Sequence, residues 1–512
     1  MRTKLSVVIV HWNTPDLLKK QLTVLRQDLS IQCIVVDNNS TKEPEKIDGV
    51  IYISNALNRG YASACNQGLL KAEALWVIFL NPDVLTEPAN LHMMVDEAEK
   101  RGYDACSPEP SNAGYQKPLP SVISLLAEFT LLRFLIPLHT FRTHTLFGGA
   151  LLIRREVLEK LGGWDERFFV WFEDADLTHR LLSNHRRIGW IKVPLSHDGG
   201  ASFHTLTKED SRDLFFHAMR TYAHKHFSYM GRKIIDVLSK RYTSKKLPLA
   251  RAVGVSMTIP NMHLSLLETF LSQNQNILDT LDEVIIVSSA LQNRLWKFRI
   301  KYPFYIFIPL AKNRGFAHTV NIGLRRSTMS YTGTVNDDTV LQPSFFQQAP
   351  AYFQKHPNTG SVNPVIKKPD GTIESAGIHI LKKGKAIPIT DAPTQIDATN
   401  AACVIYNREA LQKTGLFDEH FGSYLEDIDL SLSLSKKGYI NTVLSNAHIT
   451  HLGQQSSKDL GAYKNYLDAK NWVMLIAKHW SFPDLLFNGG AILVERLRNI
   501  SGILKAYFAQ KD

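Results

Sequence analysis

Continuous apolar runs alternate with amphipathic stretches in the first part of the chain. The run LSVVIV at residues 5–10 is followed by an amphipathic stretch over 15–29. Further apolar runs and one helical stretch come next: CIVVD at 33–37, GVIYIS at 49–54, a helical pattern at about 61–74 and WVIFL at 76–80. Buried branched residues separated by helical patterns predict a parallel β-sheet built from βαβ units.

Polar residues gather where these predicted strands end. Asn13 follows the first strand, the second strand ends on Asp37 with Asn39 two residues beyond, and Asn81-Pro82-Asp83 follows the strand WVIFL. Sheets of this type bind ligands at the carboxyl ends of their strands. We therefore expect an active site at this edge of the sheet.

The chain repeats itself once. The segment NRGYASACNQGL at Asn58 returns as NRGFAHTVNIGL at Asn313, 255 residues later, and LGGWDERFFVWFEDADL returns as TGLFDEHFGSYLEDIDL at an offset of 253. HDGGAS at His197 returns as HLGQQS at His451. Each copy is one domain long, which excludes a short solenoid repeat. A polar, basic stretch at 241–251 marks the boundary, so we expect domains at 1–247 and 248–512.

Two acidic segments closely follow aromatic residues. FVWFEDADLTHRL begins at Phe169, and GSYLEDIDLSLSL begins at Gly422. A solvated acidic loop would not need the aromatic residues, and a core would not tolerate the acids unpaired. Asp176 suits the first turn of a helix, where the helix dipole favours an acid. Trp171 and Phe172 offer a flat apolar wall for a sugar, or they are ordinary core aromatics.

Composition describes a globular protein. Of 512 residues, 44% are hydrophobic and 21% charged, and the four cysteines form no CxxC pair, which fits a reducing cytoplasm. The N-terminal run lacks a signal-peptide cleavage site, so we expect it to form a strand. No stretch of 18 uncharged apolar residues occurs.

The net charge of +11 indicates an anionic partner. No nucleic-acid-binding module is visible, so a nucleotide sugar or an anionic membrane surface is favoured and no nucleic-acid partner is expected. Two amphipathic segments, 119–141 and 484–512, are candidates for contact with such a membrane. The alternative is that each segment packs against its own domain.

Several segments together resemble one family. They are SVVIVHWN, IVVDNNS, NRGYASACNQGL, FLNPDV, FGGALLIRREVLEKLGGWDERFFVWFEDADL and HDGGAS. They look like a family 2 glycosyltransferase, closest to the bacterial rhamnosyltransferase-like group, over about 4–230 and again over 253–480. The resemblance implies an α/β fold with two tandem GT-A domains, which are Rossmann-like nucleotide-diphospho-sugar transferase domains.

The resemblance also implies roles for individual residues. It makes Asp174 and Asp427 the catalytic bases, and it places a divalent cation, Mg²⁺ or Mn²⁺, at the acidic turns. The metal ligands are Asp83, His197, Asp338 and His451; the donor-binding residues are Asn13, Asp37, Asn39, Arg59, Gly60, Asn81, Arg314, Gly315, Asn336 and Asp337; and Trp171, Glu173 and Glu426 bind the acceptor. Structural alternatives stay open: Asp37 suits an Asx turn, and a lone histidine before glycines is commonly structural.

The second copy departs from the first at one position. Ser288 or Ser289 stands where the first copy has Asp37, whereas Asn336-Asp337-Asp338 is a fuller acidic turn. We expect both domains to be catalytic, although the missing acid favours an alternative in which the second domain only binds acceptor or acts as a scaffold.

The function that we expect is that of a dual-domain inverting glycosyltransferase. It would transfer sugars from dTDP-L-rhamnose or a UDP-sugar onto a glycan or lipid-linked glycan. The product would be a bacterial surface polysaccharide of O-antigen or capsule type. The expected location is the cytoplasm, with peripheral association at the inner face of the plasma membrane.

Overall fold

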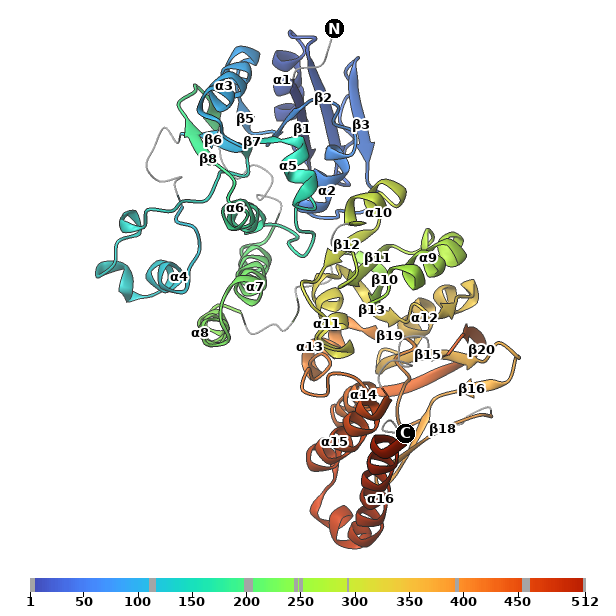
Figure 1. Cartoon of the computed structure of the whole chain (residues 1–512). Helices are drawn as coiled ribbons and strands as arrows, with labels where there is room; N and C mark the ends of the chain where they lie inside the picture. The colour runs from blue at the N-terminus through green and yellow to red at the C-terminus, as the bar shows by residue number, and fades with distance from the viewer. Residues whose placement is uncertain are drawn as a thin grey trace. The chain divides into compact units, whose positions relative to one another are not determined.

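The computed structural model describes residues 5–109, 117–197, 206–243, 247, 252–291, 294–391, 396–453 and 461–509. The chain forms two compact units (Figure 1). Unit 1 consists of Met1–Pro248 and Asn293–Phe304, and unit 2 consists of Leu249–Gln292 and Tyr305–Asp512. Residues 293–304 therefore belong to unit 1, although they lie within the second sequence repeat.

Unit 1 is built on a seven-stranded sheet with the order β3-β2-β1-β4-β7-β6-β8. Its strands are β1 (Leu5–His11), β2 (Ile31–Asp37), β3 (Val50–Ser54), β4 (Trp76–Leu80), β6 (Ala105–Pro108), β7 (Ala150–Arg154) and β8 (Ile188–Ile191). Strands β3, β2, β1 and β4 are parallel, which confirms the prediction for this half of the sheet. Strand β7 is antiparallel to both β4 and β6, which the hydrophobic pattern did not predict. The short strands β5 (Val84–Leu85) and β9 (Ser196–His197) form a separate antiparallel pair.

The helices of unit 1 lie on both faces of this sheet and in a separate helical cluster. They are α1 (Pro15–Leu25), α2 (Tyr61–Leu69), α3 (Pro88–Arg101), α4 (Val122–Phe129), α5 (Arg155–Lys160), α6 (Glu173–Ser183), α7 (Lys208–His226), α8 (Tyr229–Lys240) and α10 (Leu295–Lys301), with the 3₁₀ turns η2 (Leu131–Phe134) and η3 (Leu138–Thr140). Leucines and methionine of α1 and α3 join one core with the sheet, and apolar residues of α2, α5 and α6 join another. The burial of these two apolar layers is the main stabilising contribution to such a fold.

Two predicted helical segments differ in detail from the sequence pattern. Helix α2 ends at Leu69, five residues before the predicted end at about residue 74. The amphipathic segment 119–141 forms α4 and two short 3₁₀ turns rather than one helix. Leu125 of α4 is buried in a third core with Phe216 and Tyr222 of α7, so part of this segment does pack against its own unit.

Unit 2 repeats this strand order with additions. Its main sheet has the order β12-β11-β10-β13-β19-β15-β20-β14, with β16 paired to β15. The strands are β10 (Ala252–Asn261), β11 (Glu283–Ser288), β12 (Ile306–Pro309), β13 (Met329–Val335), β14 (Thr339–Val340), β15 (Thr359–Lys367), β16 (Ile373–Ser375), β19 (Cys403–Asn407) and β20 (Ile440–His451), and β17 (Ile378–Leu381) and β18 (Lys385–Pro388) form a hairpin. The four neighbouring strands β12, β11, β10 and β13 are parallel. Strand β19 is antiparallel to β13, as β7 is to β4 in unit 1.

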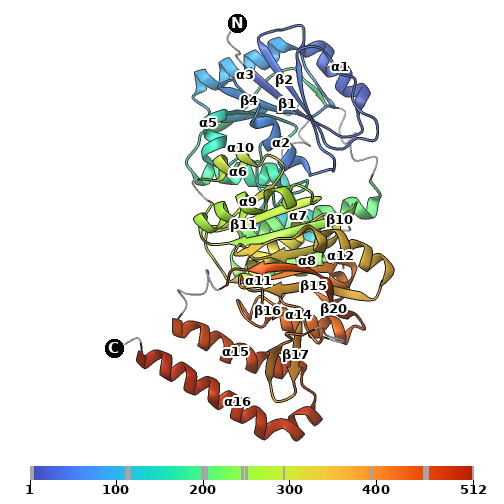
Figure 2. The same ribbon diagram turned by 90° about the vertical axis from the view of Figure 1, so that its right-hand side faces the viewer.

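The helices of unit 2 follow the same scheme and add a C-terminal pair. They are α9 (Leu264–Leu278), α11 (Phe316–Arg326), α12 (Pro343–Lys355), α13 (Arg408–Thr414), α14 (Glu426–Lys436), α15 (Gly461–His479) and α16 (Phe482–Ala509). Helices α15 and α16 lie side by side, drawn in red in Figure 2. Within the described ranges, no helix has the length and apolar character needed to cross a membrane.

Candidate active sites

Asp174 lies at the start of α6, directly after a strained turn. Glu173 is the first residue of this helix and Asp174 the second. The two preceding residues, Trp171 and Phe172, have φ angles of 64° and 65°. Residues other than glycine rarely adopt this left-handed region, so such strain marks a candidate functional turn. The backbone N–H of Ala175 donates a hydrogen bond to the Asp174 carboxylate at 2.7 Å, which fixes its orientation.

Unit 2 contains the same turn. Tyr424 and Leu425 have φ angles of 71° and 66°, and Glu426 and Asp427 then begin α14. The backbone N–H of Ala401 donates to the Asp427 carboxylate at 3.1 Å. The turn and its acid pair therefore occur at equivalent places in both units.

Each acid pair combines a buried glutamate with a partly exposed aspartate, and the pKa shifts have the same direction in both units. The side chains of Glu173 and Glu426 lie in the interior, and the Oε2 atom of each has no hydrogen-bond partner among the described residues. Burial and the charge of Asp174 raise the pKa of Glu173 to about 8, and burial and Asp427 raise the pKa of Glu426. Burial also raises the pKa of both aspartates. The unit 1 pair therefore retains a proton at neutral pH, because two adjacent carboxylates resist double ionisation, and the pKa shifts in unit 2 have the same direction.

The two predicted aromatic residues of the first pair differ in exposure. Phe172 is buried and packs against Phe215, with ring centroids 5.3 Å apart. Trp171 is partly exposed and meets the same ring edge-on at 5.9 Å. Phe172 is thus a core residue, and an acceptor role for Trp171 stays a prediction.

At the sheet edge of unit 1, Asp37 is paired with a histidine that the sequence did not single out. The Nδ1 atom of His11 lies 2.9 Å from the Asp37 carboxylate, and its Nε2 atom accepts the backbone N–H of Thr14. This arrangement places the imidazole proton on Nδ1, which donates to Asp37. Burial alone would raise the pKa of Asp37, but hydrogen bonds from His11 and Ser40 outweigh burial and hold this pKa below its ordinary value.

The asparagines after Asp37 divide into an exposed residue and a buried one. Asn39, the predicted donor residue, is exposed and has a φ of 65°. Its neighbour Asn38 is buried, accepts the N–H of Arg59 at 3.0 Å and donates to the carbonyl of Gly60 at 3.2 Å. Asn13, also predicted, has a φ of 57° at the end of the adjacent strand.

Gly60 and Gly315 are needed for close backbone packing. Gly60 has a φ of 83°, and a Cβ atom there would lie 2.5 Å from the carbonyl oxygen of Phe169. Gly315 has a φ of 98°, and a Cβ atom would lie 2.8 Å from the carbonyl oxygen of Gly422. In each unit the glycine therefore brings the start of the following helix, α2 or α11, against the segment that carries the acid pair.

The adjacent arginines are placed differently. Within unit 1, the guanidinium of Arg59 donates to the carbonyl of Phe304 at 2.6 Å and lies 5.8 Å from the centroid of its ring. Arg314 of unit 2 is exposed to solvent. The donor roles of both arginines stay predictions.

Ser288 occupies the position of Asp37 in unit 2. The strand register pairs Asn261 with Ser288, as it pairs His11 with Asp37. Ser288 donates to Asn261 at 2.8 Å, and Asn261 in turn donates to Asp337 at 2.5 Å. Burial and the neighbouring carboxylate raise the pKa of Asp337 to about 6. The carboxylate at this edge thus comes from the acidic turn rather than from the strand end.

The turns that contain Asp83 and Asp338 are anchored alike. The N–H of Asn81 donates to Gly149 at 2.9 Å, and that of Asn336 donates to Ala402 at the same distance. Gln21 of α1 also donates to the carbonyl of Asn81 at 2.8 Å. Each turn is therefore held at the start of an antiparallel strand, β7 in unit 1 and β19 in unit 2.

A histidine lies beside the acidic turn in both units. The Nε2 atom of His451 lies 3.2 Å from the Asp338 carboxylate, and its Nδ1 atom lies 3.1 Å from both oxygens of Glu374. In unit 1 the backbone of His197 pairs with Val84, the residue after the corresponding aspartate. The His197 side chain lies outside the described residues.

The residues at the two acidic turns fit a cation site whose remaining ligands would come from a bound substrate. In the described part of the chain, no three His, Cys, Asp or Glu side chains are grouped closely enough to hold a metal on their own. Asp338 and His451 nevertheless offer one oxygen and one nitrogen ligand side by side. Mg²⁺ is commonly held by one or two carboxylates together with substrate phosphates, which matches this incomplete set.

An ionic network that the sequence analysis missed supports each acid-pair helix, and it is more deeply buried in unit 1 than in unit 2. Lys225 of α7 bonds both Asp165 and Asp176, and Asp176 also meets Arg180 at 2.7 Å and His226 at 2.8 Å. The equivalents in unit 2 are Asp418, Asp429, Lys478 and His479. The signal was present, because the Lys-His dipeptide recurs at the same offset of 253 as the acid pairs. Asp176 is thus an ionised partner in the interior as well as a first-turn acid.

Family comparison agrees with the duplicated architecture. The model described as Glycosyl transferase family 2 matches residues 6–162 and again 259–415. These matches cover more than half of the chain, and the chain belongs to this family. The GT-A fold class is thereby confirmed for a chain with two α/β units. Residues 138–198 also match the model described as N-terminal domain of galactosyltransferase.

Three curated relatives are similar at modest identity. The Haloferax volcanii low-salt glycan biosynthesis hexosyltransferase Agl10 is 26% identical over 210 residues, which cover 38% of this chain and 66% of that protein. The Mycobacterium tuberculosis N-acetylglucosaminyl-diphospho-decaprenol L-rhamnosyltransferase is 25% identical, covering 43% of this chain and 84% of the relative. The Myxococcus xanthus O-antigen biosynthesis protein RfbC is 24% identical, covering 59% of this chain and 25% of the relative.

Solved structures overlap only partly with the chain. GalNAc-T7, solved with UDP, GalNAc and Mn²⁺, is 13% identical with a TM-score of 0.36 and covers 44% of this chain and 48% of its own. The Pyrobaculum calidifontis mannosyltransferase PcManGT, solved with GDP-Man and Mn²⁺, is 17% identical with a TM-score of 0.35 and covers 59% of this chain and 87% of its own.

Proposed function

We propose that both units are inverting glycosyltransferases that act on nucleotide-sugar donors. The observation that carries this proposal is the duplicated Glu-Asp pair. Glu173-Asp174 and Glu426-Asp427 each begin a helix after two left-handed residues. A unit that no longer catalysed transfer would have no need of a strained turn that presents an acid pair.

The chemistry follows from the position of the aspartates. Asp174 or Asp427 removes the proton of the acceptor hydroxyl while the hydroxyl oxygen bonds to the anomeric carbon. The bond from that carbon to the nucleoside diphosphate breaks, the diphosphate leaves with the electron pair, and the configuration inverts. The raised pKa of each aspartate makes it a stronger base.

The acidic turns have a separate task in this proposal. A divalent cation, Mg²⁺ or Mn²⁺, would neutralise the charge that develops on the leaving diphosphate. Asp83 with His197 would hold it in unit 1, and Asp338 with His451 in unit 2. At the same sheet edge, Asp37 would accept N–H groups of the donor base in unit 1, while unit 2 presents Ser288 and Asp337.

The donor and acceptor classes come from the relatives. One of them is an L-rhamnosyltransferase of a diphospho-decaprenol glycan, and another is an O-antigen biosynthesis protein. We therefore infer dTDP-L-rhamnose as donor, with a UDP-sugar as the competing choice, and a glycan or lipid-linked glycan as acceptor. The product is a bacterial surface polysaccharide, assembled in the cytoplasm at the anionic inner face of the plasma membrane.

One observation favours a second candidate function. Ser288 replaces the strand-end carboxylate of unit 1, so unit 2 could bind acceptor glycan without transferring sugar. Under this alternative, unit 1 alone would catalyse transfer.

The experiment for the proposed function is a donor panel. The full chain is incubated with dTDP-L-rhamnose, UDP-sugars and GDP-sugars, a short glycan acceptor, and Mg²⁺, Mn²⁺ or EDTA, and released nucleotide is measured. The proposal predicts acceptor-dependent, cation-dependent release with a restricted set of donors. Product formation that is unchanged in EDTA would contradict the cation assignment, and absence of transfer with every donor would contradict the proposed function.

A further inference from the structure

Unit 1 exposes a compact apolar tip at η2. Leu131, Phe134 and Leu135 have exposed fractions of 79%, 69% and 78%, and we call these three residues the η2 tip. Single exposed apolar residues are ordinary on protein surfaces, whereas a cluster within five consecutive positions marks an interaction surface. The start of η2 is fixed by a hydrogen bond, because the side chain of Thr130 accepts the N–H of Leu132 at 3.1 Å.

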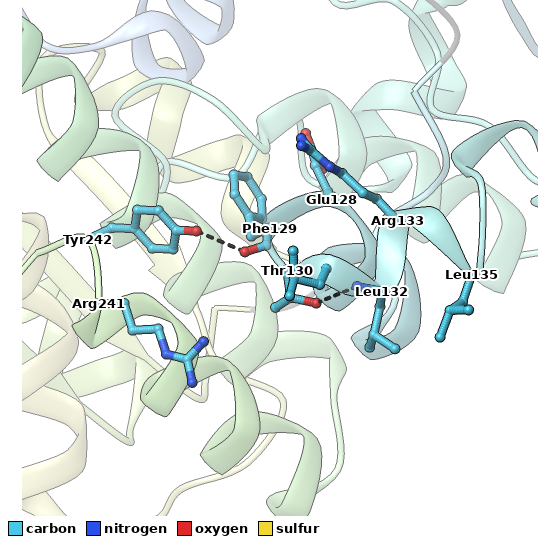
Figure 3. A pocket seen from close by; sticks show the side chains of 9 residues that line it. Glu128, Phe129, Thr130, Leu132, Arg133, Leu135, Arg241 and Tyr242 are labelled. Atoms are coloured by element: carbon cyan, nitrogen blue, oxygen red, sulfur yellow. Dashed lines mark hydrogen bonds between the residues drawn. The ribbon is translucent and has the colours of Figure 1, made fainter.

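The tip borders a cavity of about 630 Å³ between two helical segments. Figure 3 shows Phe129 and Leu132 from one segment and Arg241 and Tyr242 from the end of α8 around this cavity. The hydroxyl of Tyr242 donates to the carbonyl of Phe129 at 2.8 Å, which ties the two segments together. The cavity thus combines apolar walls with a guanidinium at its rim.

The surroundings of the tip carry excess positive charge. Segments 117–144 and 227–243 contain seven basic residues and two acidic ones. Of the two acids, Asp236 is paired with His224 at 3.0 Å, and burial raises the pKa of Glu128. Exposed apolar side chains beside Arg133 and Arg241 match the boundary of a bilayer that contains anionic lipid.

Aromatic packing connects this surface with the candidate active site. Phe129 lies 5.7 Å from Phe215, and Phe215 lies 5.9 Å from Trp171, measured between ring centroids. Trp171 belongs to the left-handed turn that leads into Glu173 and Asp174. A single phenylalanine ring therefore separates the residue that lines the cavity from the turn that positions the acid pair.

We propose that the η2 tip inserts into a bilayer containing anionic phospholipid, with Arg133 and Arg241 bound to the phosphate groups. This surface places unit 1 against the membrane in which a lipid-linked acceptor is embedded, and the inference rests on the proposed function for that acceptor alone. An apolar surface of this kind can also bind a second copy of the chain. The experiment below distinguishes membrane binding from dimerisation.

The test is co-sedimentation of the full chain with phosphatidylcholine vesicles that contain or lack phosphatidylglycerol. The apolar variant combines Leu131→Ser, Phe134→Ser and Leu135→Ser, and the charge variant combines Arg133→Glu and Arg241→Glu. A matched control combines Leu29→Ser and Leu75→Ser, which are 72% and 69% exposed elsewhere in unit 1. We expect binding only to the anionic vesicles, at least about tenfold weaker in either test variant and unchanged in the control.

Three further readings distinguish the outcomes. Thermal unfolding of every variant should match the full chain, because the altered side chains are exposed. Sugar transfer to a soluble acceptor should also be unchanged, so loss of vesicle binding with intact transfer supports the membrane role while leaving the proposed function intact. Equal binding of all variants to vesicles overturns the inference, and so does sedimentation velocity showing that the apolar variant dissolves a dimer instead.

Discussion

Arg299 lies against Glu166 in the interior of unit 1, with 3.4 Å between Nη2 and Oε1 and side-chain exposures of 3% and 4%. Arg299 belongs to α10, which follows β11 in the second sequence repeat, yet it completes unit 1. In unit 2 the equivalent acid, Glu419, meets Arg325 of its own helix α11 at 3.0 Å. The segment before the first acid pair is thus supported by a cation from the second repeat.

Replacing this cation should destabilise unit 1. Arg299→Met leaves the buried carboxylate of Glu166 without the guanidinium that faces it, and losing one partner of a buried pair costs about 3 kcal/mol. Urea unfolding of the full chain should show this loss, and the double variant with Glu166→Gln should recover part of it. The matched control is Arg325→Met. Arg325 and its partner Glu419 are 40% and 37% exposed, so this variant should lose only about 0 to 1 kcal/mol of unfolding free energy. Equal losses in the two variants would contradict the assigned role of Arg299.

Glu173→Gln should stabilise the protein at neutral and alkaline pH. The ordinary pKa of a glutamate is 4.5, and in the folded chain burial and Asp174 raise the pKa of Glu173 to about 8. Because the raised pKa favours the protonated folded state, its contribution is complete below pH 4.5 and is lost as the pH rises to about 8. Glutamine has no proton to lose, so we expect a gain of about 4 kcal/mol at about pH 8.

The pH series itself checks this prediction. The difference in unfolding free energy between Glu173→Gln and the unaltered chain should grow from about pH 5 to about pH 8. Glu156→Gln, at a residue 66% exposed on α5, should show no such growth. If the Glu173→Gln variant is no more stable than the unaltered chain at the alkaline end of the series, the pKa of Glu173 is not raised in the folded state and the prediction is wrong.

Glu374 should govern cation affinity in unit 2 although it would not contact the cation. It hydrogen bonds Nδ1 of His451, which leaves Nε2 directed at Asp338. Carboxylates that orient a ligating histidine change metal affinity about 10- to 100-fold when they are removed. Glu374→Gln in an Asp83→Asn background should therefore weaken Mn²⁺ binding, measured by electron paramagnetic resonance with nucleoside diphosphate present. Asp338→Asn sets the scale for full loss, and an unchanged Mn²⁺ affinity in Glu374→Gln would exclude this role.

Asp37→Asn should weaken donor use by unit 1 alone. The variant removes the charge that His11 and the backbone N–H of Ser40 stabilise, and a hydrogen bond to a charged group contributes about 1.5 to 3 kcal/mol. The KM for the donor of unit 1 should therefore rise about tenfold or more. Ser288→Ala in unit 2 removes only a hydroxyl bonded to Asn261 and should change the KM for its donor by less. A rise in the KM for the donors of both units would show that Asp37 stabilises the protein as a whole and does not act in donor binding by unit 1.

Much of the fold could be predicted because local pattern and tertiary context agree. The parallel strands β1 to β4 are continuous apolar runs, and the repeat placed Glu173 and Glu426 in equivalent positions. The antiparallel half of the sheet could not be predicted, since hydrophobic pattern does not specify strand direction. The repeat offset aligned the two copies in sequence but did not decide whether Ser288 or Ser289 corresponds to Asp37. The strand register shows that Ser288 does.

Other parts of the site depend on long-range contacts that no local pattern contains. His11 resembles an ordinary strand residue in the sequence, and its role appears only when β1 and β2 bring it to Asp37. Arg299 lies 133 positions from Glu166, in a segment that has no counterpart in the first repeat. Lys225 could have been found, because its Lys-His dipeptide recurs at the offset of the acid pairs.

The central claim is that each unit transfers a sugar with its own aspartate. The most direct test is linkage analysis of the products formed by the full chain, by Asp174→Asn and by Asp427→Asn under identical conditions. We predict that each variant loses one product or one linkage, with a rate reduction of about 10²- to 10⁴-fold at that step and the other step unchanged. An Asp427→Asn chain that still forms every product at the original rate would contradict the claim and leave unit 2 as a binding domain.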